Sequence, residues 1–106
     1  MTTRNKQSEK TIRQLEAIAG EKFSLGGFLA AIRQGEEMTQ VEFAKLLRIS
    51  KQNLCDIEHR RRSVSLKAAS GFAKKLGYAP DQFIRLALQD IVDRAGIRFI
   101  VEVKAA

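Results

Sequence analysis

The sequence has one cysteine, one histidine, one proline and no tryptophan among its 106 residues. The single cysteine, Cys55, cannot close an intramolecular disulfide, and together with His59 it cannot complete a four-ligand zinc site. These two side chains also lack an obvious orienting group, and no glycine-rich phosphate loop is present. We therefore expect no enzymatic activity, no metal and no cofactor.

Long apolar runs are absent as well. No stretch approaches the roughly 18 to 20 apolar residues that cross a bilayer, so we expect no membrane partner. The first ten residues, MTTRNKQSEK, lack the apolar run of a signal peptide or an anchor, which favours a cytoplasmic protein. With 44% hydrophobic residues, the chain is long enough for one compact core and too short for two ordinary domains.

Acidic residues are too few to balance the basic ones, and the formal net charge is +7. Residues 48–75 hold eight basic and two acidic side chains, so nearly all of the excess lies there. Residues 76–106 hold four of each, which argues against a basic membrane-binding tail. A basic region of this kind favours a polyanionic partner.

Apolar residues recur at spacings of three and four over most of the chain, which predicts five to six helices. A polar arm at 1–7 precedes a helix over about 9–19, and a second helix runs from Ser24 to about Gly35. Three further helices follow within 39–77, and the last one runs from Pro80 to Gly96.

Two helices in the middle of the chain have well-marked starts. Thr39 and Glu42 have the spacing of a capping box, in which each side chain satisfies a backbone N–H of the other residue. Ser50 begins the next helix, which runs to about His59 and is followed by three consecutive arginines.

The end of the chain has a different period. Residues 97–104 alternate between apolar and polar over most of their length, which predicts one β-strand. Its apolar side comprises Ile97, Phe99, Val101 and Val103. Because a lone strand leaves its backbone groups unpaired, we expect it to pair with the same strand of a second copy in a homodimer.

The helix over 50–59 has an outer face without aliphatic side chains. A turn of 100° per residue places Leu54 and Ile57 inward. The side chains that face outward or flank that face are Lys51, Gln52, Asn53, Cys55, Asp56 and His59. Polar outer faces are common on ordinary solvated helices, but this helix also fits the major groove, where glutamine can pair with adenine and lysine with guanine.

The segment TQVEFAKLLRISKQNLCDIEHRRRSVSLKAASGFAKKLG resembles the XRE family of helix-turn-helix proteins, which includes phage Cro and repressor proteins. The resemblance implies an all-α, lambda-repressor-like domain, which we place over 8–95 with its motif at 39–59. The dimerisation strand that the alternating pattern predicts follows at 96–106. It assigns base reading to Lys51, Gln52, Cys55 and Asp56. It assigns phosphate contacts to Gln40, Asn53, Arg60, Arg61 and Arg62, which would supply affinity that is independent of sequence.

The same resemblance predicts an ion pair between Arg33 and Glu58, because the family often pairs the equivalent glutamate with an arginine seven residues before the phosphate-binding glutamine. Two positions depart from the family pattern, since arginine stands at 48 and at 60 where glycine is usual. A left-handed conformation at such a position costs an arginine on the order of 1 kcal/mol.

These patterns together predict a dimeric, sequence-specific regulator of transcription that binds double-stranded DNA, a repressor with a near-palindromic operator. The resemblance implies an alternative, because many small proteins of this family are antitoxins, which bind a toxin protein and also their own operator. The C-terminal strand fits either role, because it can pair with a second copy or with the edge of a partner's sheet.

Overall fold

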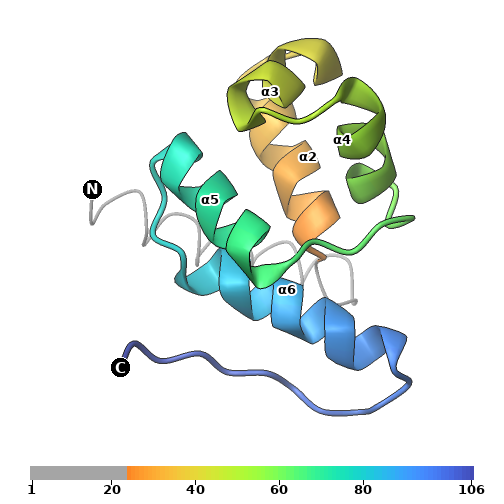
Figure 1. Ribbon diagram of the computed structural model, residues 1–106, viewed down its shortest axis with the longest axis vertical. Helices are drawn as coiled ribbons and strands as arrows, with labels where there is room; N and C mark the ends of the chain where they lie inside the picture. Colours follow the sequence, from red (N-terminus) through yellow and green to blue (C-terminus); the bar gives the residue numbers. More distant parts are fainter. Residues whose placement is uncertain (1–23) are drawn as a thin grey trace.

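The computed structural model describes residues 24–106. This part of the chain is all-helical (Figure 1). Its helices are α2 (Leu25–Gly35), α3 (Gln40–Leu47), α4 (Lys51–Glu58), α5 (Leu66–Leu76) and α6 (Asp81–Arg94). The arm expected at 1–7 and the helix expected over 9–19 lie outside the described residues.

Four of these helices begin at a serine or threonine that accepts a hydrogen bond from the N–H three residues later. The capping residues are Ser24, Thr39, Ser50 and Ser65. At Thr39 the capping box is complete, because the Glu42 carboxylate also accepts from the Thr39 N–H at 2.9 Å. Side-chain caps of this kind typically stabilise a helix by about 1 kcal/mol, so local sequence defines these starts.

Helix α2 packs against α4 and α6, while α3 packs against α4 and α5, and α5 against α6 (Figure 1). The largest fully buried side chains are Leu29, Phe43, Leu47, Leu54, Phe83 and Leu86. They come from all the described helices except α5, which adds Ala69 and Ala73 to the same core. A single hydrophobic core therefore includes side chains of both α3 and α4, the helix-turn-helix pair.

The crossing of α2 and α4 depends on a glycine. A Cβ atom on Gly26 would overlap the backbone carbonyl of Ile57, so no larger side chain fits while the two helices stay in place. Gly26 is itself buried. This contact sets the position of the C-terminal end of α4 on the core.

The expected C-terminal strand is not present among residues 24–106. After α6, Gly96 adopts a left-handed conformation with φ 73°, and the Ile97 N–H bonds to the Val92 carbonyl, which turns the chain back. Residues 97–106 then run alongside α6 without forming a ladder (Figure 1). A ladder needs a second strand, and the described part of this single chain offers none.

A buried glutamine takes the place of that second strand. The Gln89 side chain donates to the Phe99 carbonyl at 2.8 Å and accepts from the Val101 N–H at 2.8 Å. The predicted apolar side is covered only in part, since Val101 and Val103 are half-buried whereas Ile97 and Phe99 are exposed.

Candidate nucleic-acid interface

Helix α4 lies with two apolar side chains in the core and its polar face outward. Leu54 is fully buried and Ile57 nearly so, while Lys51 and Gln52 are exposed at the start of the helix. Ser50 caps the helix by accepting from the Asn53 N–H at 3.0 Å. Packing and capping therefore fix both the rotation and the start of α4.

Three of the predicted contact residues form a chain of hydrogen bonds on this outer face. Asp56 Oδ1 accepts from Gln52 Nε2 at 3.0 Å and from Arg61 Nε at 3.1 Å, and Arg61 Nη2 lies 3.0 Å from the same oxygen. This hydrogen bond to Asp56 is the main cause that raises the pKa of Arg61. The arginine thus neutralises a carboxylate that would otherwise repel phosphate, and the carboxylate orients Gln52.

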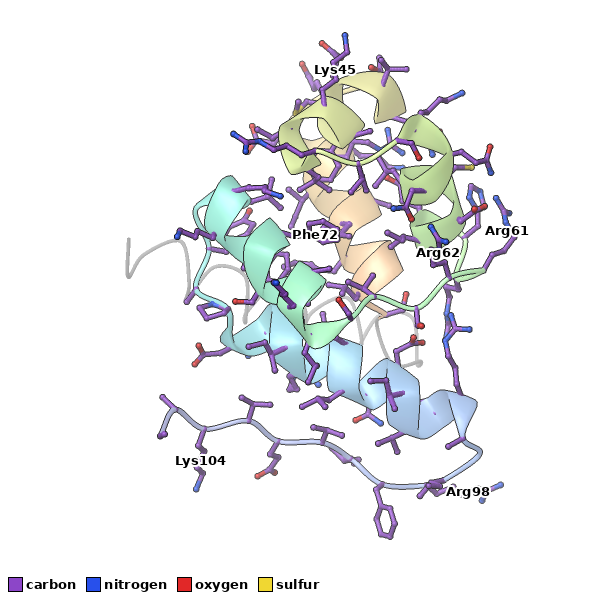
Figure 2. The ribbon with its side chains drawn as sticks, viewed as in Figure 1. Lys45, Arg61, Arg62, Phe72, Arg98 and Lys104 are labelled. Atoms are coloured by element: carbon purple, nitrogen blue, oxygen red, sulfur yellow. The ribbon has the colours of Figure 1, made fainter. Side chains whose placement is uncertain are left out.

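Other residues on and beside this outer face make further local contacts. Cys55 Sγ lies 3.5 Å from both Arg61 Nη2 and His59 Nδ1, and His59 Nδ1 lies 2.8 Å from the Cys55 carbonyl. Arg62 Nη1 donates to Asn53 Oδ1 at 2.9 Å, so the arginine folds back onto the flank of α4. Figure 2 shows Arg61 and Arg62 beside α4 at the surface.

Glu58 lies on the inner side of α4 and joins three helices. Its carboxylate accepts from Arg33 Nε at 2.8 Å and from Arg33 Nη2 at 3.1 Å, a two-point ion pair. It also accepts from Gln40 Nε2 at 3.0 Å. The hydrogen bond to Glu58 is the main cause that raises the pKa of Arg33. The structure thus brings together the predicted pair Arg33 and Glu58, and adds Gln40 to it.

Arg48 and Arg60, which stand where the family favours glycine, both adopt left-handed backbone conformations. Arg48 follows α3 with φ 60°, and Arg60 lies after α4 with φ 62°. Each conformation costs an L-residue about 1 kcal/mol relative to glycine. The chain therefore turns through a left-handed residue at both positions, at a cost in stability, and each position carries a cation.

The carbonyl of Arg60 has a partner from a distant helix. Arg94 Nη2 donates to it at 2.8 Å, while Arg94 Nε bonds to Asp90 Oδ2 at 2.7 Å within α6. This contact joins the end of α6 to the loop after α4 that holds Arg60, Arg61 and Arg62. Sequence reasoning missed it, because the two residues are 34 positions apart and nothing local marks them as partners.

Three of the basic residues that sequence reasoning left unassigned lie together. Arg48, Lys67 and Lys75 line an open groove of about 570 Å³ between α4 and α5, together with Asn53 and Arg62. Lys75 Nζ donates to the Leu47 carbonyl at 3.1 Å. The excess of basic residues within 48–75 could have identified Lys67 and Lys75, because both belong to that region.

The part of the chain that the structure describes lacks two further features. Within residues 24–106, no three His, Cys, Asp or Glu side chains are grouped so that they could hold a metal ion. None of the described helices is long and apolar enough to span a bilayer.

Comparison with known proteins agrees with this geometry. A family model described as helix-turn-helix matches residues 29–83, a little over half of the chain. The match covers the Arg33–Glu58 pair, the motif helices α3 and α4, and the basic groove. Neither the curated proteins nor the solved structures gave a match to the chain. The chain belongs to the XRE-type helix-turn-helix family of DNA-binding transcriptional regulators.

Proposed function

We propose that this protein is a dimeric repressor that reads a near-palindromic DNA site with helix α4 and represses transcription by occupying that site. The observation that carries the proposal is the hydrogen-bonded chain Gln52–Asp56–Arg61 on the outer face of α4. These side chains are held in defined positions before DNA arrives, which favours selective readout because less side-chain ordering is left for binding.

Within this proposal, base reading falls to the side chains at the start and on the outer face of α4. Gln52 uses one N–H for Asp56, and its oxygen and second N–H suit the paired acceptor and donor of adenine. Lys51 is exposed at the first position of the helix, where it can reach the acceptors of guanine. Cys55 and Asp56 complete the reading surface, with Asp56 as the residue that positions Gln52 and Arg61.

Phosphate binding falls to residues on both sides of that face. Gln40 lies at the first position of α3, where Glu58 orients its amide, and Asn53 lies on the flank of α4 beside Arg62. Arg60 and Arg61 extend the loop after α4, and the groove adds Arg48, Lys67 and Lys75. Each phosphate that is neutralised releases counterions, which makes binding strongly dependent on salt.

A twofold dimer presents two α4 helices to DNA. In this family geometry, the half-sites are separated by about 34 Å, one turn of the double helix. Inverted repeats with this spacing are therefore the expected operators. Twofold symmetry also doubles the phosphate contacts, so affinity would fall steeply when the dimer dissociates.

An antitoxin is the second candidate function, and the exposed C-terminal segment favours it. Phe99 is 69% exposed and Ile100 is 75% exposed, and apolar side chains exposed next to each other favour a protein-binding role for this segment. A toxin with an open sheet edge could add this segment as a further strand. DNA binding through α4 would be the same in either role.

Selection from a random duplex DNA library at near-physiological salt tests the proposal. We expect the protein to enrich an inverted repeat, and we expect Gln52→Ala to lose the preference for one base in each half-site. Retention of DNA without enrichment would contradict the proposal, since it would mean that the arginines bind phosphate while α4 reads nothing. A gene for a toxin next to an enriched site would favour the antitoxin role.

A further inference from the structure

Within the part of the chain that the structure describes, the C-terminal segment has one backbone edge in use and one edge unused. Gln89 bonds to the carbonyl of Phe99 and to the N–H of Val101. In extended backbone, the polar groups of alternate residues point to opposite edges, so the groups of residues 98, 100 and 102 point away from Gln89. In the described part of the chain, the backbone groups of these three residues make no hydrogen bond.

The contacts of Gln89 imitate those of a neighbouring strand. In a parallel sheet, a residue bonds to the two residues on either side of the one that lies opposite it in the neighbouring strand. The Gln89 amide bonds in the same way to Phe99 and Val101, which lie on either side of Ile100. Gln89 is buried, with 5% of its surface exposed, and its amide N–H₂ also bonds to Asp93 Oδ1 at 2.9 Å. The amide is therefore fixed, and it holds the segment extended with its outer edge toward solvent.

We propose that this outer edge pairs with the same edge of a second copy, in an antiparallel ribbon whose twofold axis passes through Ile100. This inference rests on the dimeric regulator proposed above and gives its interface a defined register. The second copy is favoured as the occupant because residues 76–106 carry no net charge, whereas the +6 of residues 48–75 lies in another part of the chain. Two copies can therefore approach here without strong repulsion.

Charge complementarity selects the register. With the axis at Ile100, Arg98 lies opposite Glu102 of the second copy, and by symmetry the same pair forms again at the other end. If the axis moves by one residue toward the C-terminus, Arg98 lies opposite Lys104 and two positive charges face each other. If it moves by two residues, the two copies of Glu102 lie opposite each other. Moving it by one residue toward the N-terminus leaves Arg98 opposite Ile100. The register at Ile100 therefore pairs both charges and stacks the most exposed apolar side chain on itself.

The same ribbon brings exposed apolar side chains of the two copies beside each other. Ile97, Phe99 and Ile100 are exposed on the segment, and Ile91 is 48% exposed on α6. Figure 2 shows Arg98 near the start of the segment and Lys104 near its end, so charged side chains flank this apolar region. An apolar centre with a charged rim is the usual composition of an interface between proteins.

Sedimentation equilibrium of the full chain without DNA tests the ion pairs. We expect Arg98→Glu to raise the dimer dissociation constant at least about tenfold, because it sets two carboxylates opposite each other at both ends of the ribbon. We expect the double variant Arg98→Glu with Glu102→Arg to return to within about threefold of the unmodified chain. Unchanged dimerisation of Arg98→Glu would overturn the inference, and so would a chain that stays monomeric at about 100 µM.

Disulfide formation tests the register in a Cys55→Ser background. Directly opposed residues have Cα atoms about 5.5 Å apart, so Ile100→Cys should cross-link the dimer under mild oxidation. Lys104→Cys is the matched control, because the two copies of that residue would be about 27 Å apart in this register and should not link. Links at 104 but not at 100 would overturn the inference.

Gln89→Leu tests the positioning role of the amide. It keeps the size of the side chain but removes both backbone contacts, so we expect weaker dimerisation and loss of hydrogen-exchange protection at the Val101 N–H. Unchanged dimerisation would overturn that role. These outcomes are separate from the proposed function, which fails if library selection enriches no DNA sequence and survives if a dimer that reads an inverted repeat forms through another surface.

Discussion

Helix α4 and the C-terminal segment both offer side chains to a partner, but they are held by different means. Helix α4 has Leu54 and Ile57 in the core, and Glu58 ties it to two other helices. The C-terminal segment is held mainly by the side chain of Gln89 and leaves Phe99 exposed. The fold therefore sets the geometry of α4 by itself, whereas the segment, within residues 24–106, relies largely on one side chain and keeps large apolar side chains exposed.

The largest effect should come from the core beneath α4. Leu54→Ala removes a fully buried side chain and should lower the free energy of unfolding by about 2 to 5 kcal/mol. Val101→Ala is the matched truncation in the C-terminal segment and should cost less than about 1 kcal/mol in the monomer, because Val101 is only half-buried. Urea denaturation of both variants measures the difference. Equal losses would mean that the segment is as firmly packed as α4.

A somewhat smaller effect should come from the ion pair behind α4. Glu58→Gln keeps the shape of the side chain but leaves Arg33, whose side chain is only 15% exposed, without its charged partner. We expect a loss of about 2 to 3 kcal/mol in unfolding free energy, since an uncompensated charge near the core is costly. Asp90→Asn removes the charge of an exposed ion pair with Arg94, leaves the Arg94 bond to the Arg60 carbonyl in place, and should cost less than about 1 kcal/mol. The same denaturation measurement compares the two, and a smaller loss for Glu58→Gln would contradict the expectation.

On DNA, the comparison lies within the α4 region itself. Gln52→Ala should cost roughly 1 to 3 kcal/mol on the preferred sequence and should relax one base position. Arg61→Ala should weaken binding to all sequences by a similar factor and should make the salt dependence shallower. Titration of labelled duplexes at several salt concentrations distinguishes these results. If Gln52→Ala weakened binding equally on every DNA sequence, Gln52 would have no role in reading bases.

The sequence predicted the α4 region well because most of its determinants are local. The caps at Thr39 and Ser50 each act within three residues, and the family resemblance located the Arg33–Glu58 contact across 25 residues. The anchoring of the C-terminal segment was not predicted. Gln89 looks like an ordinary polar residue of α6, and its partners lie in an irregular segment whose alternating pattern indicated only a strand.

A smaller effect, of opposite sign, is expected at the turn between α3 and α4. Arg48 has a left-handed conformation, so Arg48→Gly should raise the unfolding free energy by up to about 1 kcal/mol. Lys45→Gly, three residues earlier in α3, should lower it by about the same amount, because glycine disfavours helix. The denaturation midpoints of the two variants show the direction in which each one changes the unfolding free energy. Since Arg48 lines the basic groove, Arg48→Gly should also weaken DNA binding, so stability and affinity would change in opposite directions.

The smallest effect concerns the cap of α3 and depends on pH. The hydrogen bond from the Thr39 N–H is the main cause that lowers the pKa of Glu42 below its ordinary value of 4.5. A carboxylate with a lowered pKa stabilises the folded protein above the unfolded pKa, and this contribution disappears as the pH falls through the folded value. Glu42→Gln should therefore lower the melting temperature at pH 6, and the gap to the unmodified chain should shrink toward pH 3. Glu37→Gln, an exposed carboxylate in the preceding turn, is the control and should show little gap at either pH. A gap for Glu42→Gln that stayed constant between pH 6 and pH 3 would mean that the cap acts through shape rather than charge.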